Sequence, residues 1–266
     1  MKLFEQKISL ASASRAARAA GKLMRQNLRA TKTINQQSQH DIKLELDVRC
    51  QKLIERLLRV DFPAVAVFGE EGFSGDQEAD ARWVIDPIDG TVNFTYGIPH
   101  ACVSIALQNK SKVQRSQSQV EYKTIVGVVY DPFCDELWTA IRGQPARLNG
   151  KIIRVSSRKK LDEAIVSIGF AKTRSNLEKA LPYFNQLVPQ VRKVRMMGAA
   201  ALALTYVASG RFDAYVETGI RLWDIAAGGI IVECAGGEFW RREIDDQQTY
   251  QVIASNGLLR PQLEKF

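Results

Sequence analysis

The amino-acid sequence predicts a layered sandwich of helices and mixed β-strands, of the α+β or α/β class. Two patterns predict it. Between residues 125 and 155, short β-favouring runs alternate with turn residues, as in a β-meander. From residue 164 onward, strand-like and helix-like patterns alternate. A chain of 266 residues can bury a large core, and we expect one domain over 1–266, with an N-terminal part over about 1–155 and a C-terminal part over about 156–266.

The N-terminal region is predicted to be mainly helical. Small apolar residues form one helical face over 3–28, and a second helical pattern runs over 41–63. The polar stretch 31–40 between them is predicted to be a loop. Because residues 1–40 hold a single acid, Glu5, among many Arg, Lys, Ser and Ala, this region also resembles an organelle transit peptide. We favour a structural helix, since the pattern continues without a processing boundary.

The other elements follow from runs of β-favouring residues and from helical spacing. Strands are expected at 64–68, 83–85, 102–107, 125–130, 136–141, 146–148, 152–155, 164–170, 191–196, 212–217, 238–241 and 250–254. Helices are expected at 175–187, 198–209, 222–235 and 258–266. The polar stretch 109–124, rich in Lys, Ser and Gln, is predicted to be a hairpin loop.

The composition is that of an ordinary soluble globular protein, with 45% hydrophobic and 25% charged residues. No apolar run approaches the roughly 20 residues of a membrane span, so we expect no membrane partner. The four cysteines form no Cys-x-x-Cys pair and no secretory signal is seen, which predicts reduced thiols in a cytoplasmic protein. The net charge is +8, but the basic residues look dispersed, and the clusters at 154–160 and 192–195 lack interleaved aromatics. A solvated basic face is therefore favoured over a nucleic-acid surface.

One acidic stretch suggests a metal site. The β-favouring run Trp83 to Ile85 ends in Asp86-Pro87-Ile88-Asp89-Gly90-Thr91. We expect a tight turn that aims both carboxylates to one side and frees the carbonyl of Ile88. Two carboxylates and a carbonyl make an all-oxygen site, which suits Mg²⁺, Ca²⁺ or Mn²⁺ rather than zinc. Thr91 is placed to cap a helix whose N–H groups face an anion, although a surface turn has the same composition.

Three further acids lie at strand ends or helix starts. Glu70 follows a predicted strand between glycines, Asp47 lies in the second predicted helix, and Asp224 stands where a helix should begin. Each has an ordinary explanation: a loop acid for Glu70, an exposed helix face for Asp47, and an N-cap worth about 1 kcal/mol for Asp224. Their recurrence beside glycines at strand ends favours a shared ligand site.

The full set of motifs resembles the inositol monophosphatase family of Mg²⁺-dependent, lithium-sensitive phosphatases. The resemblance rests on Gly69-Glu70-Glu71, on the run from Asp86 to Phe94, and on Trp223-Asp224-Ile225-Ala226-Ala227-Gly228, with Gly198-Ala199-Ala200 and Asp213-Ala214-Tyr215-Val216-Glu217 in the expected order between them. It covers nearly the whole chain. It implies the layered α/β/α/β/α sandwich of the sugar-phosphatase superfamily, which includes fructose 1,6-bisphosphatase, and usually a homodimer.

The resemblance also implies roles for individual residues. The implied ligands of two or three Mg²⁺ ions are Glu70, Asp86, the Ile88 carbonyl, Asp89 and Asp224. Glu70 is expected to orient the attacking water, helped by a Thr91–Asp47 pair, and the N–H groups of Gly90 and Thr91 to hold phosphate oxygens. The implied substrate contacts further include Asp89, Gly198, Ala199, Ala200, Glu217 and Asp224.

Three positions depart from the family pattern. Gln36 stands where many members carry lysine and Leu44 where many carry threonine, in a region that borders a weaker third metal, so occupancy of that third site stays open. Ala199 stands where several relatives have Thr or Ser. The missing hydroxyl contact is worth roughly 0.5–1.5 kcal/mol, enough to change substrate preference without abolishing catalysis.

The leading functional prediction is a Mg²⁺-dependent phosphomonoesterase acting on a small polyol phosphate, with myo-inositol 1-phosphate favoured. Fructose 1,6-bisphosphate, histidinol phosphate, adenosine 3′,5′-bisphosphate and NADP are alternative substrates of the same chemistry. A different class is an RNA- or transcription-associated protein on the same fold, for example one that binds RNA polymerase; the basic charge permits it, but it is not favoured, because a pure scaffold needs no metal ligands.

Overall fold

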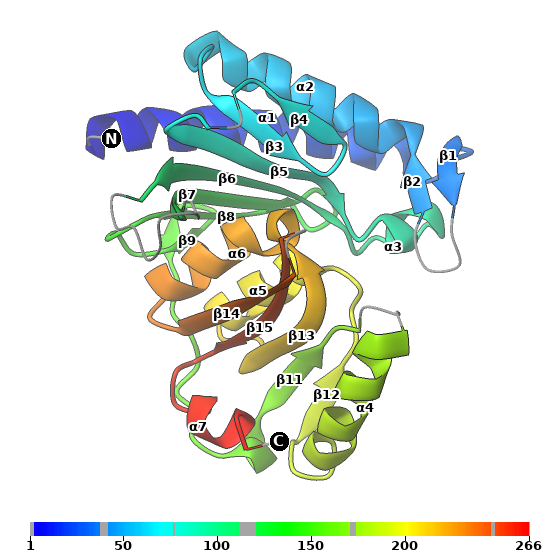
Figure 1. Cartoon of the computed structure of the whole chain (residues 1–266), viewed down its shortest axis with the longest axis vertical. Coiled ribbons are helices and arrows are strands. Elements are labelled where there is room, and N and C mark those ends of the chain that lie inside the picture. The colour runs from blue at the N-terminus through cyan, green and yellow to red at the C-terminus, as the bar shows by residue number, and fades with distance from the viewer. Residues whose placement is uncertain are drawn as a thin grey trace.

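The fold consists of five alternating layers of helices and sheets, seen in a computed structural model of the chain (Figure 1). The structure describes residues 3–37, 42–76, 78–111, 121–170, 174–245 and 248–265. From top to bottom in Figure 1 the layers are a helix pair, a large sheet, a second helix pair, a smaller sheet, and two outer helices. This arrangement confirms the predicted α/β/α/β/α sandwich.

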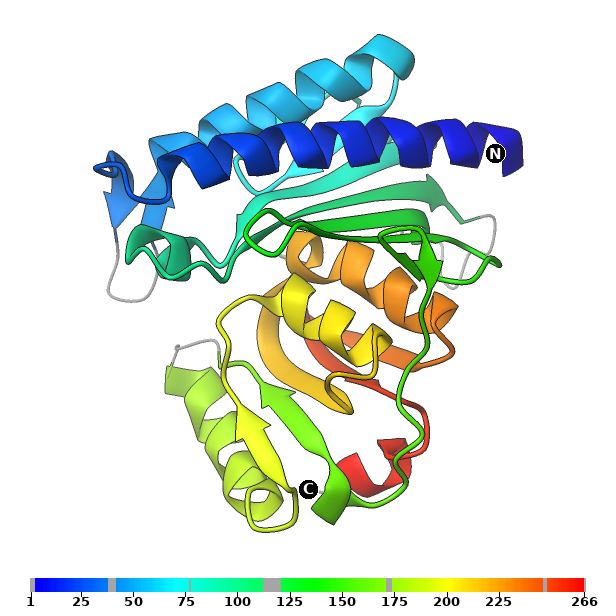
Figure 2. The same ribbon diagram turned by 180° about the vertical axis from the view of Figure 1, so that it is seen from behind.

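The first helix pair covers the outer face of the large sheet. The helices are α1 (Leu3–Asn27) and α2 (Glu45–Asp61), and α1 lies along the outside of the molecule (Figure 2). Alanines make up much of the α1 face that packs inward; Ala13, Ala16, Ala17 and Ala20 are fully buried. The predicted structural helix over 3–28 is thereby confirmed.

The large sheet has eight strands in the order β10-β9-β8-β7-β6-β5-β3-β4. Their bounds are β3 Ala66–Gly69, β4 Gly72–Ser74, β5 Ala81–Asp89, β6 Cys102–Lys110, β7 Tyr122–Asp131, β8 Glu136–Ile141, β9 Arg147–Leu148 and β10 Lys151–Ile152. The pair β3/β5 is parallel, and the neighbours from β5 to β10 pair antiparallel. The part from β7 to β10 is the meander predicted between residues 125 and 155.

The central helix pair is apolar nearly all round because it is buried between two sheets. It consists of α5 (Ala200–Ala208) and α6 (Leu222–Cys234). A glycine lets the large sheet approach α6 closely. A Cβ at Gly127 of β7 would lie 2.5 Å from Ile230 Cγ2 and 2.8 Å from the Ala227 carbonyl oxygen, both on α6. The packing of α6 on the large sheet therefore depends on the absence of a side chain at Gly127.

The smaller sheet has five strands in the order β12-β11-β13-β15-β14. Their bounds are β11 Ile165–Ile168, β12 Lys193–Arg195, β13 Ala214–Arg221, β14 Glu238–Asp245 and β15 Thr249–Ser255. Its outer face carries α4 (Arg174–Leu187) and α7 (Arg260–Leu263), and a 3₁₀ turn at Leu161–Glu163 precedes β11. Buried apolar side chains of this sheet and of the outer elements form a separate small core.

Several local predictions were wrong. The predicted loop 31–40 contains β1 (Ile34–Gln37), which pairs with β2 (Ile42–Leu44), so the following helix begins at Glu45 and not at residue 41. Burial of Leu44, and the bond from its N–H to Asp47 Oδ2 (2.7 Å), fix the later start.

The predicted loop 109–124 and the predicted last helix 258–266 were also too long. Within 109–124, the residues at both ends belong to β6 and β7, and 112–120 lie outside the described residues. Strand β4 was not predicted, and the last helix spans only Arg260–Leu263. Segments this short carry too little periodicity to be recognised.

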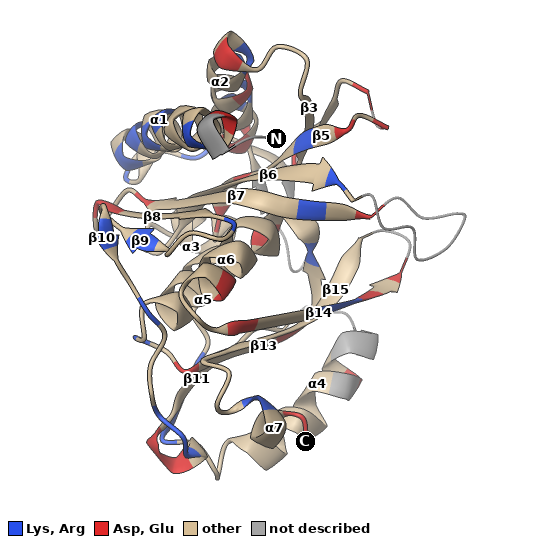
Figure 3. Cartoon of the chain, turned by 90° about the vertical axis from the view of Figure 1, so that its left-hand side faces the viewer, with Lys and Arg blue, Asp and Glu red and all other residues tan. Residues whose placement is uncertain are grey.

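The surface agrees with the composition. Lys and Arg occur along α1 and in several separate places on the fold, as Figure 3 shows from one side. No helix in the described ranges is long and apolar enough to cross a membrane. All four cysteines are free, and Cys50 and Cys102 are buried.

Replacing Gly127 by alanine should destabilise the protein. The added methyl group meets backbone as well as side-chain atoms of α6, so we expect a loss of about 1–3 kcal/mol in the free energy of unfolding. Urea denaturation measures it. Lys123→Ala, on an exposed position of the same strand, is the matched control and should stay within about 0.5 kcal/mol. Equal stability of Gly127→Ala and wild type would contradict the close α6–β7 packing.

Candidate active site

The end of strand β5 carries the acidic motif as a β-bulge. Asp86 pairs with Ser104 and Asp89 with Cys102, so three steps along β5 oppose two steps along β6. The predicted tight turn is therefore wrong: the strand continues to Asp89 and absorbs one extra residue. Pro87 lacks an N–H and suits a bulge, and the Ile88 N–H donates to Asp86 Oδ1 (3.0 Å). Residues three apart face opposite sides of a regular strand, so the bulge is what allows both carboxylates to reach one side.

Three carboxylates converge at this point. Oxygens of Asp86, Asp89 and Asp224 all lie within 4.8 Å of one another. Asp224 is in the first turn of α6, where its Oδ2 accepts the Arg221 N–H (2.9 Å). The ordinary explanation, that Asp224 is the N-cap of this helix, is wrong: Arg221 is the N-cap, and Asp224 at N3 bonds back to it as in a capping box.

Asp89 is held by the N-terminus of α5. Its two carboxylate oxygens accept the N–H groups of Ala200 (3.1 Å) and Ala201 (2.7 Å), and the thiol of Cys102 lies 3.6 Å from Oδ2. The amide of Ala200, predicted to contact substrate, is therefore bound to Asp89 here. Sequence reasoning gave Cys102 no role in the site. Only its pairing with Asp89 across β5 and β6 brings it there.

Glu70 and Asp47 extend the acidic group. Glu70 lies in the turn between β3 and β4, and its N–H donates to the carbonyl of Ile85 on β5 (3.1 Å), which places it beside the bulge. Asp47 is buried in the first turn of α2. Burial, followed by the charges of Asp224 and Asp47, raises the pKa of Glu70 well above its usual range. The predicted acids thus belong to one electrostatic cluster.

The segment after the bulge begins a short helix, α3 (Thr91–Thr95). Its N-cap is Gly90, in a left-handed conformation (φ 93°), and not Thr91 as predicted. A Cβ at Gly90 would lie 2.9 Å from the His100 carbonyl oxygen, so the position has little room for a side chain. The Thr91 hydroxyl donates to the Ile88 carbonyl (2.8 Å). Its proton is therefore directed to Ile88, while the proposed Thr91–Asp47 pair stays a prediction.

The predicted substrate contacts lie on two neighbouring segments. Gly198 and Ala199 precede α5, next to α3, because the Asn93 side-chain amide donates to the carbonyls of Met197 (2.8 Å) and His100 (2.9 Å). Glu217 is on β13, where it accepts a hydrogen bond from the Tyr215 hydroxyl. The quoted motifs contained Asn93 and Tyr215, but sequence reasoning gave neither a role.

Electrostatics make the site favour a cation. Burial raises the pKa of Asp89 to about 6, of Glu217 to about 7 and of Asp224 to about 8, and the charges of neighbouring carboxylates add to the shifts of Asp224 and Glu217. Among the described residues, no Lys or Arg forms an ion pair with Asp86, Asp89 or Asp224. A compact, uncompensated, all-oxygen set fits a hard divalent cation.

Comparison with known proteins identifies the family. Residues 6–265 match the model of the inositol monophosphatase family. The chain belongs to the inositol monophosphatase family. It is 42% identical over 233 residues to "Nus factor SuhB" of Pseudomonas aeruginosa, covering 85% of this chain and 82% of that protein. It is 40% identical to "Inositol monophosphatase 2" of Solanum lycopersicum, covering 84% and 83%.

Solved structures of the inositol monophosphatase family share the fold. The suhB protein of Bartonella henselae superposes with a TM-score of 0.84 at 30% identity and covers 96% of both chains. The inositol monophosphatase of Anabaena gives 0.80 at 31% identity, over 97% of this chain and 94% of that one. Family membership therefore holds for sequence and fold and assigns the chain to a phosphatase superfamily.

Removing Asp224 should stabilise the metal-free protein at high pH. Its folded-state pKa of about 8 lies above the usual 3.8, so the folded chain binds more protons and loses stability as pH rises from about 4 to about 8. Asp224→Asn abolishes this loss. Because Asp224 is half-buried, screening limits the gain, and we expect about 1–2 kcal/mol at pH 8 in EDTA and none near pH 4.

Chemical denaturation at the two pH values measures the effect. Asp80→Asn, at an exposed position, serves as the control and should leave the free energy of unfolding unchanged at both pH values. Lower stability of Asp224→Asn than of wild type at pH 8 in EDTA would show that the fold does not disfavour a charged carboxylate at this position.

Proposed function

We propose that the protein is a Mg²⁺-dependent phosphomonoesterase that hydrolyses a small polyol phosphate, with myo-inositol 1-phosphate as the favoured substrate. The observation that carries this proposal is the convergence of Asp86, Asp89 and Asp224 within 4.8 Å. The relatives named inositol monophosphatase support the reaction class. Lithium sensitivity, a homodimer and a cytoplasmic location belong to the same proposal.

The metal ligands in this proposal are Glu70, Asp86, the Ile88 carbonyl, Asp89 and Asp224. Two or three Mg²⁺ ions fit the proposal; near the third, Gln36 and Leu44 stand where many members of the family carry lysine and threonine. When bound, Mg²⁺ supplies Lewis-acid stabilisation of phosphate charge and lowers the pKa of water. The Ile88 carbonyl already accepts the Thr91 hydroxyl, and its second lone pair remains for a ligand.

The protein's own groups then place the reactants. Burial, and then the neighbouring acids, raise the pKa of Glu70, which suits it to accept a hydrogen bond from the attacking water and to take its proton. Thr91 and Asp47 are proposed to help orient that water. The backbone N–H groups of Gly90 and Thr91 are proposed to hold phosphate oxygens opposite the water.

The polyol is proposed to lie between the bulge and strand β13. Asp89, Asp224 and Glu217 offer acceptors for hydroxyl groups, and Gly198, Ala199 and Ala200 form a wall of small side chains. Small residues leave room for a ring, and Ala199 offers no hydroxyl to it. Fructose 1,6-bisphosphate, histidinol phosphate, adenosine 3′,5′-bisphosphate and NADP are the alternative substrates.

An assay of phosphate release tests the proposal. Wild type with Mg²⁺ should hydrolyse myo-inositol 1-phosphate, and Li⁺ should inhibit it. Asp89→Asn removes a charged metal ligand and should lower kcat/KM at least about 100-fold, since changes next to metal ligands already cost 10–100-fold. Asp80→Asn is the exposed control and should retain full activity. No phosphate release from this ester or from any of the four alternatives would refute the proposal.

A second candidate function is association with RNA or with the transcription machinery. The specific observation that favours it is the name "Nus factor SuhB" of several relatives, among them the proteins of Pseudomonas aeruginosa and Escherichia coli. The net charge of +8 is compatible with an anionic partner.

Binding to RNA can be separated from catalysis. If the second function is present, labelled RNA should bind with an affinity that falls steeply with salt and that Asp89→Asn leaves within about twofold. Titration at 50 and 200 mM salt measures it. Absence of binding to RNA and to RNA polymerase at the lower salt would remove this candidate.

A further inference from the structure

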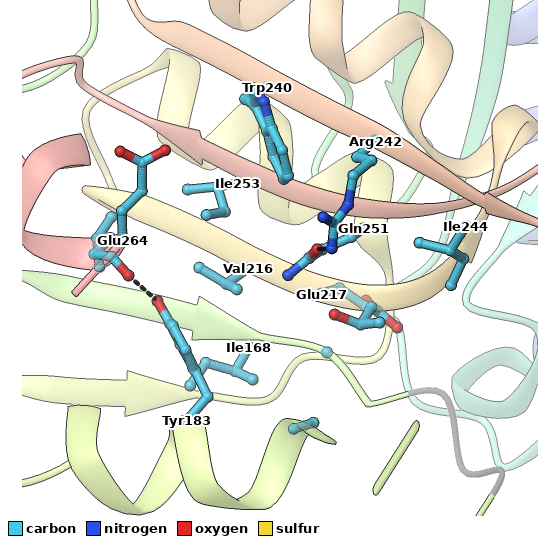
Figure 4. A pocket seen from close by; sticks show the side chains of 14 residues that line it. Ile168, Tyr183, Val216, Glu217, Trp240, Arg242, Ile244, Gln251, Ile253 and Glu264 are labelled. Atoms are coloured by element: carbon cyan, nitrogen blue, oxygen red, sulfur yellow. Dashed lines mark hydrogen bonds between the residues drawn. The ribbon is translucent and has the colours of Figure 1, made fainter. Parts of the chain in front are cut away.

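A cavity of about 520 Å³ lies on the outer face of the five-stranded sheet, away from the carboxylate cluster. Its floor is the sheet, and α4 and α7 stand at its sides (Figure 4). This volume is within the range of small-molecule sites, about 300–1,000 Å³. Of the residues named in the proposed phosphatase reaction, Glu217 is the one that also lines this cavity.

The floor consists of two parallel rows of side chains set by strand register. Ile168, Val216, Ile253 and Trp240 are successive partners across β11, β13, β15 and β14, and all four line the cavity. Two residues further along the strands, Thr218, Gln251 and Arg242 form a second row on the same face. The cavity therefore has a broad apolar strip bordered by a polar strip. Such a surface matches a flat ligand with one apolar face and one polar edge.

The polar strip ends in one available cation. Arg242 donates through Nη2 to Gln251 Oε1 (2.7 Å), and no carboxylate of the described residues forms an ion pair with it. A guanidinium has five N–H donors, so a planar fork remains for a carboxylate. Two acids, Glu217 and Glu264, border the cavity as well, and Glu264 is paired with Arg260. A single negative charge is therefore matched, whereas a dianion meets repulsion.

The cavity touches the polyol side of the active site at one residue. Glu217 points its carboxylate over Gly169, where a Cβ would lie 1.6 Å from Oε2. Both residues line the cavity, and strand β11 ends just before Gly169. The Gly169 N–H still donates to the Val216 carbonyl (3.0 Å), so Glu217 borders the cavity at the point where β11 ends.

We propose that this cavity binds a small planar aromatic monocarboxylate, with the ring on the Ile168–Val216–Ile253 strip beside Trp240 and the carboxylate on Arg242. The apolar strip supplies area for a ring. Trp240 supplies an aromatic edge, since the guanidinium carbons of Arg242 and Arg260 lie 5.9 and 5.1 Å from its ring centroid. Arg242 supplies the bidentate charge contact. Because Glu217 is shared, an occupant of the cavity changes the affinity for the polyol.

Calorimetric titration with 2-naphthoate tests the site on the full-length protein and needs no catalytic activity. The matched neutral probe is 2-naphthamide, which has the same ring and no charge. We expect naphthoate to bind at least about tenfold more tightly than naphthamide, and Arg242→Gln to remove this preference. No binding of naphthoate, or equal binding of the two probes to wild type, would overturn the proposal.

Two substitutions on α4 locate the bound probe. Ala180→Trp places an indole in the cavity and should weaken naphthoate binding at least about tenfold. Leu181→Trp, on the adjacent exposed position outside the cavity, should leave it within about twofold. Thermal unfolding of both variants checks that they fold. Equal binding by a folded Ala180→Trp variant and wild type would place the probe elsewhere.

Kinetics test the link through Glu217. Saturating naphthoate should change KM for the phosphate ester at least about twofold and leave kcat unchanged, because Glu217 is proposed to contact the polyol and not the reacting phosphate. An unchanged KM in a protein that binds naphthoate would overturn the link. A protein that binds naphthoate but hydrolyses no phosphate ester would refute the proposed reaction and leave the cavity assignment standing.

Discussion

Repulsion among buried carboxylates is the constraint on which the rest of this structure depends. For two unit charges at 4.8 Å and an effective dielectric constant of about 20, the repulsion is on the order of 3 kcal/mol for each pair. Proton uptake relieves part of it in the metal-free chain: burial, and after it the charge of Asp89, raises the pKa of Asp224 to about 8. A divalent cation relieves it without neutralising the ligands, so the fold is suited to a bound ion.

Backbone amides hold the acids in place against this repulsion. The N-terminal ends of three helices contribute these amides. The first residues of α5 donate to Asp89, and the residues just before α6 and α2 donate to Asp224 and Asp47. Helix N-termini carry a partial positive charge, which favours a carboxylate there. The geometry of the acidic cluster thus depends on the packing of α5 and α6 between the sheets. That packing needs glycine at close approaches such as Gly127 on β7 and Gly228 on α6, where a Cβ would meet Leu204 at 2.6 Å.

The layered fold and the acidic set could be predicted from the sequence, for different reasons. Long periodic segments such as α1 and the meander strands are recognisable from the spacing of their hydrophobic residues. Glu70, Asp86, Asp89 and Asp224 are recognisable because several motifs occur in a fixed order. The conformation of the central motif could not be predicted, since Asp-Pro-Ile-Asp-Gly suits a turn, and only the pairing with β6 makes it a bulge. Likewise β1 and β2 have three or four residues each and form only because they pair with each other.

The cavity on the outer sheet face lay beyond sequence reasoning for a related reason. Its two rows exist only through the register of the paired strands. Ile168 and Ile253, which belong to the same row, are more than 80 positions apart in the sequence. No local pattern in the sequence contains that register, because each strand contributes at most one side chain to each row. Arg242 and Trp240, seen in sequence alone, are two residues of a polar edge strand.

The bulge at the end of β5 bears on how the length of the motif can change. Deleting one residue between Asp86 and Asp89 would let β5 pair regularly with β6, with two steps opposing two. The sheet itself would tolerate that deletion, since regular pairing satisfies its hydrogen bonds. The spacing of the two aspartates is therefore not enforced by the sheet. It persists in this chain as an irregularity that the architecture could lose without losing its fold.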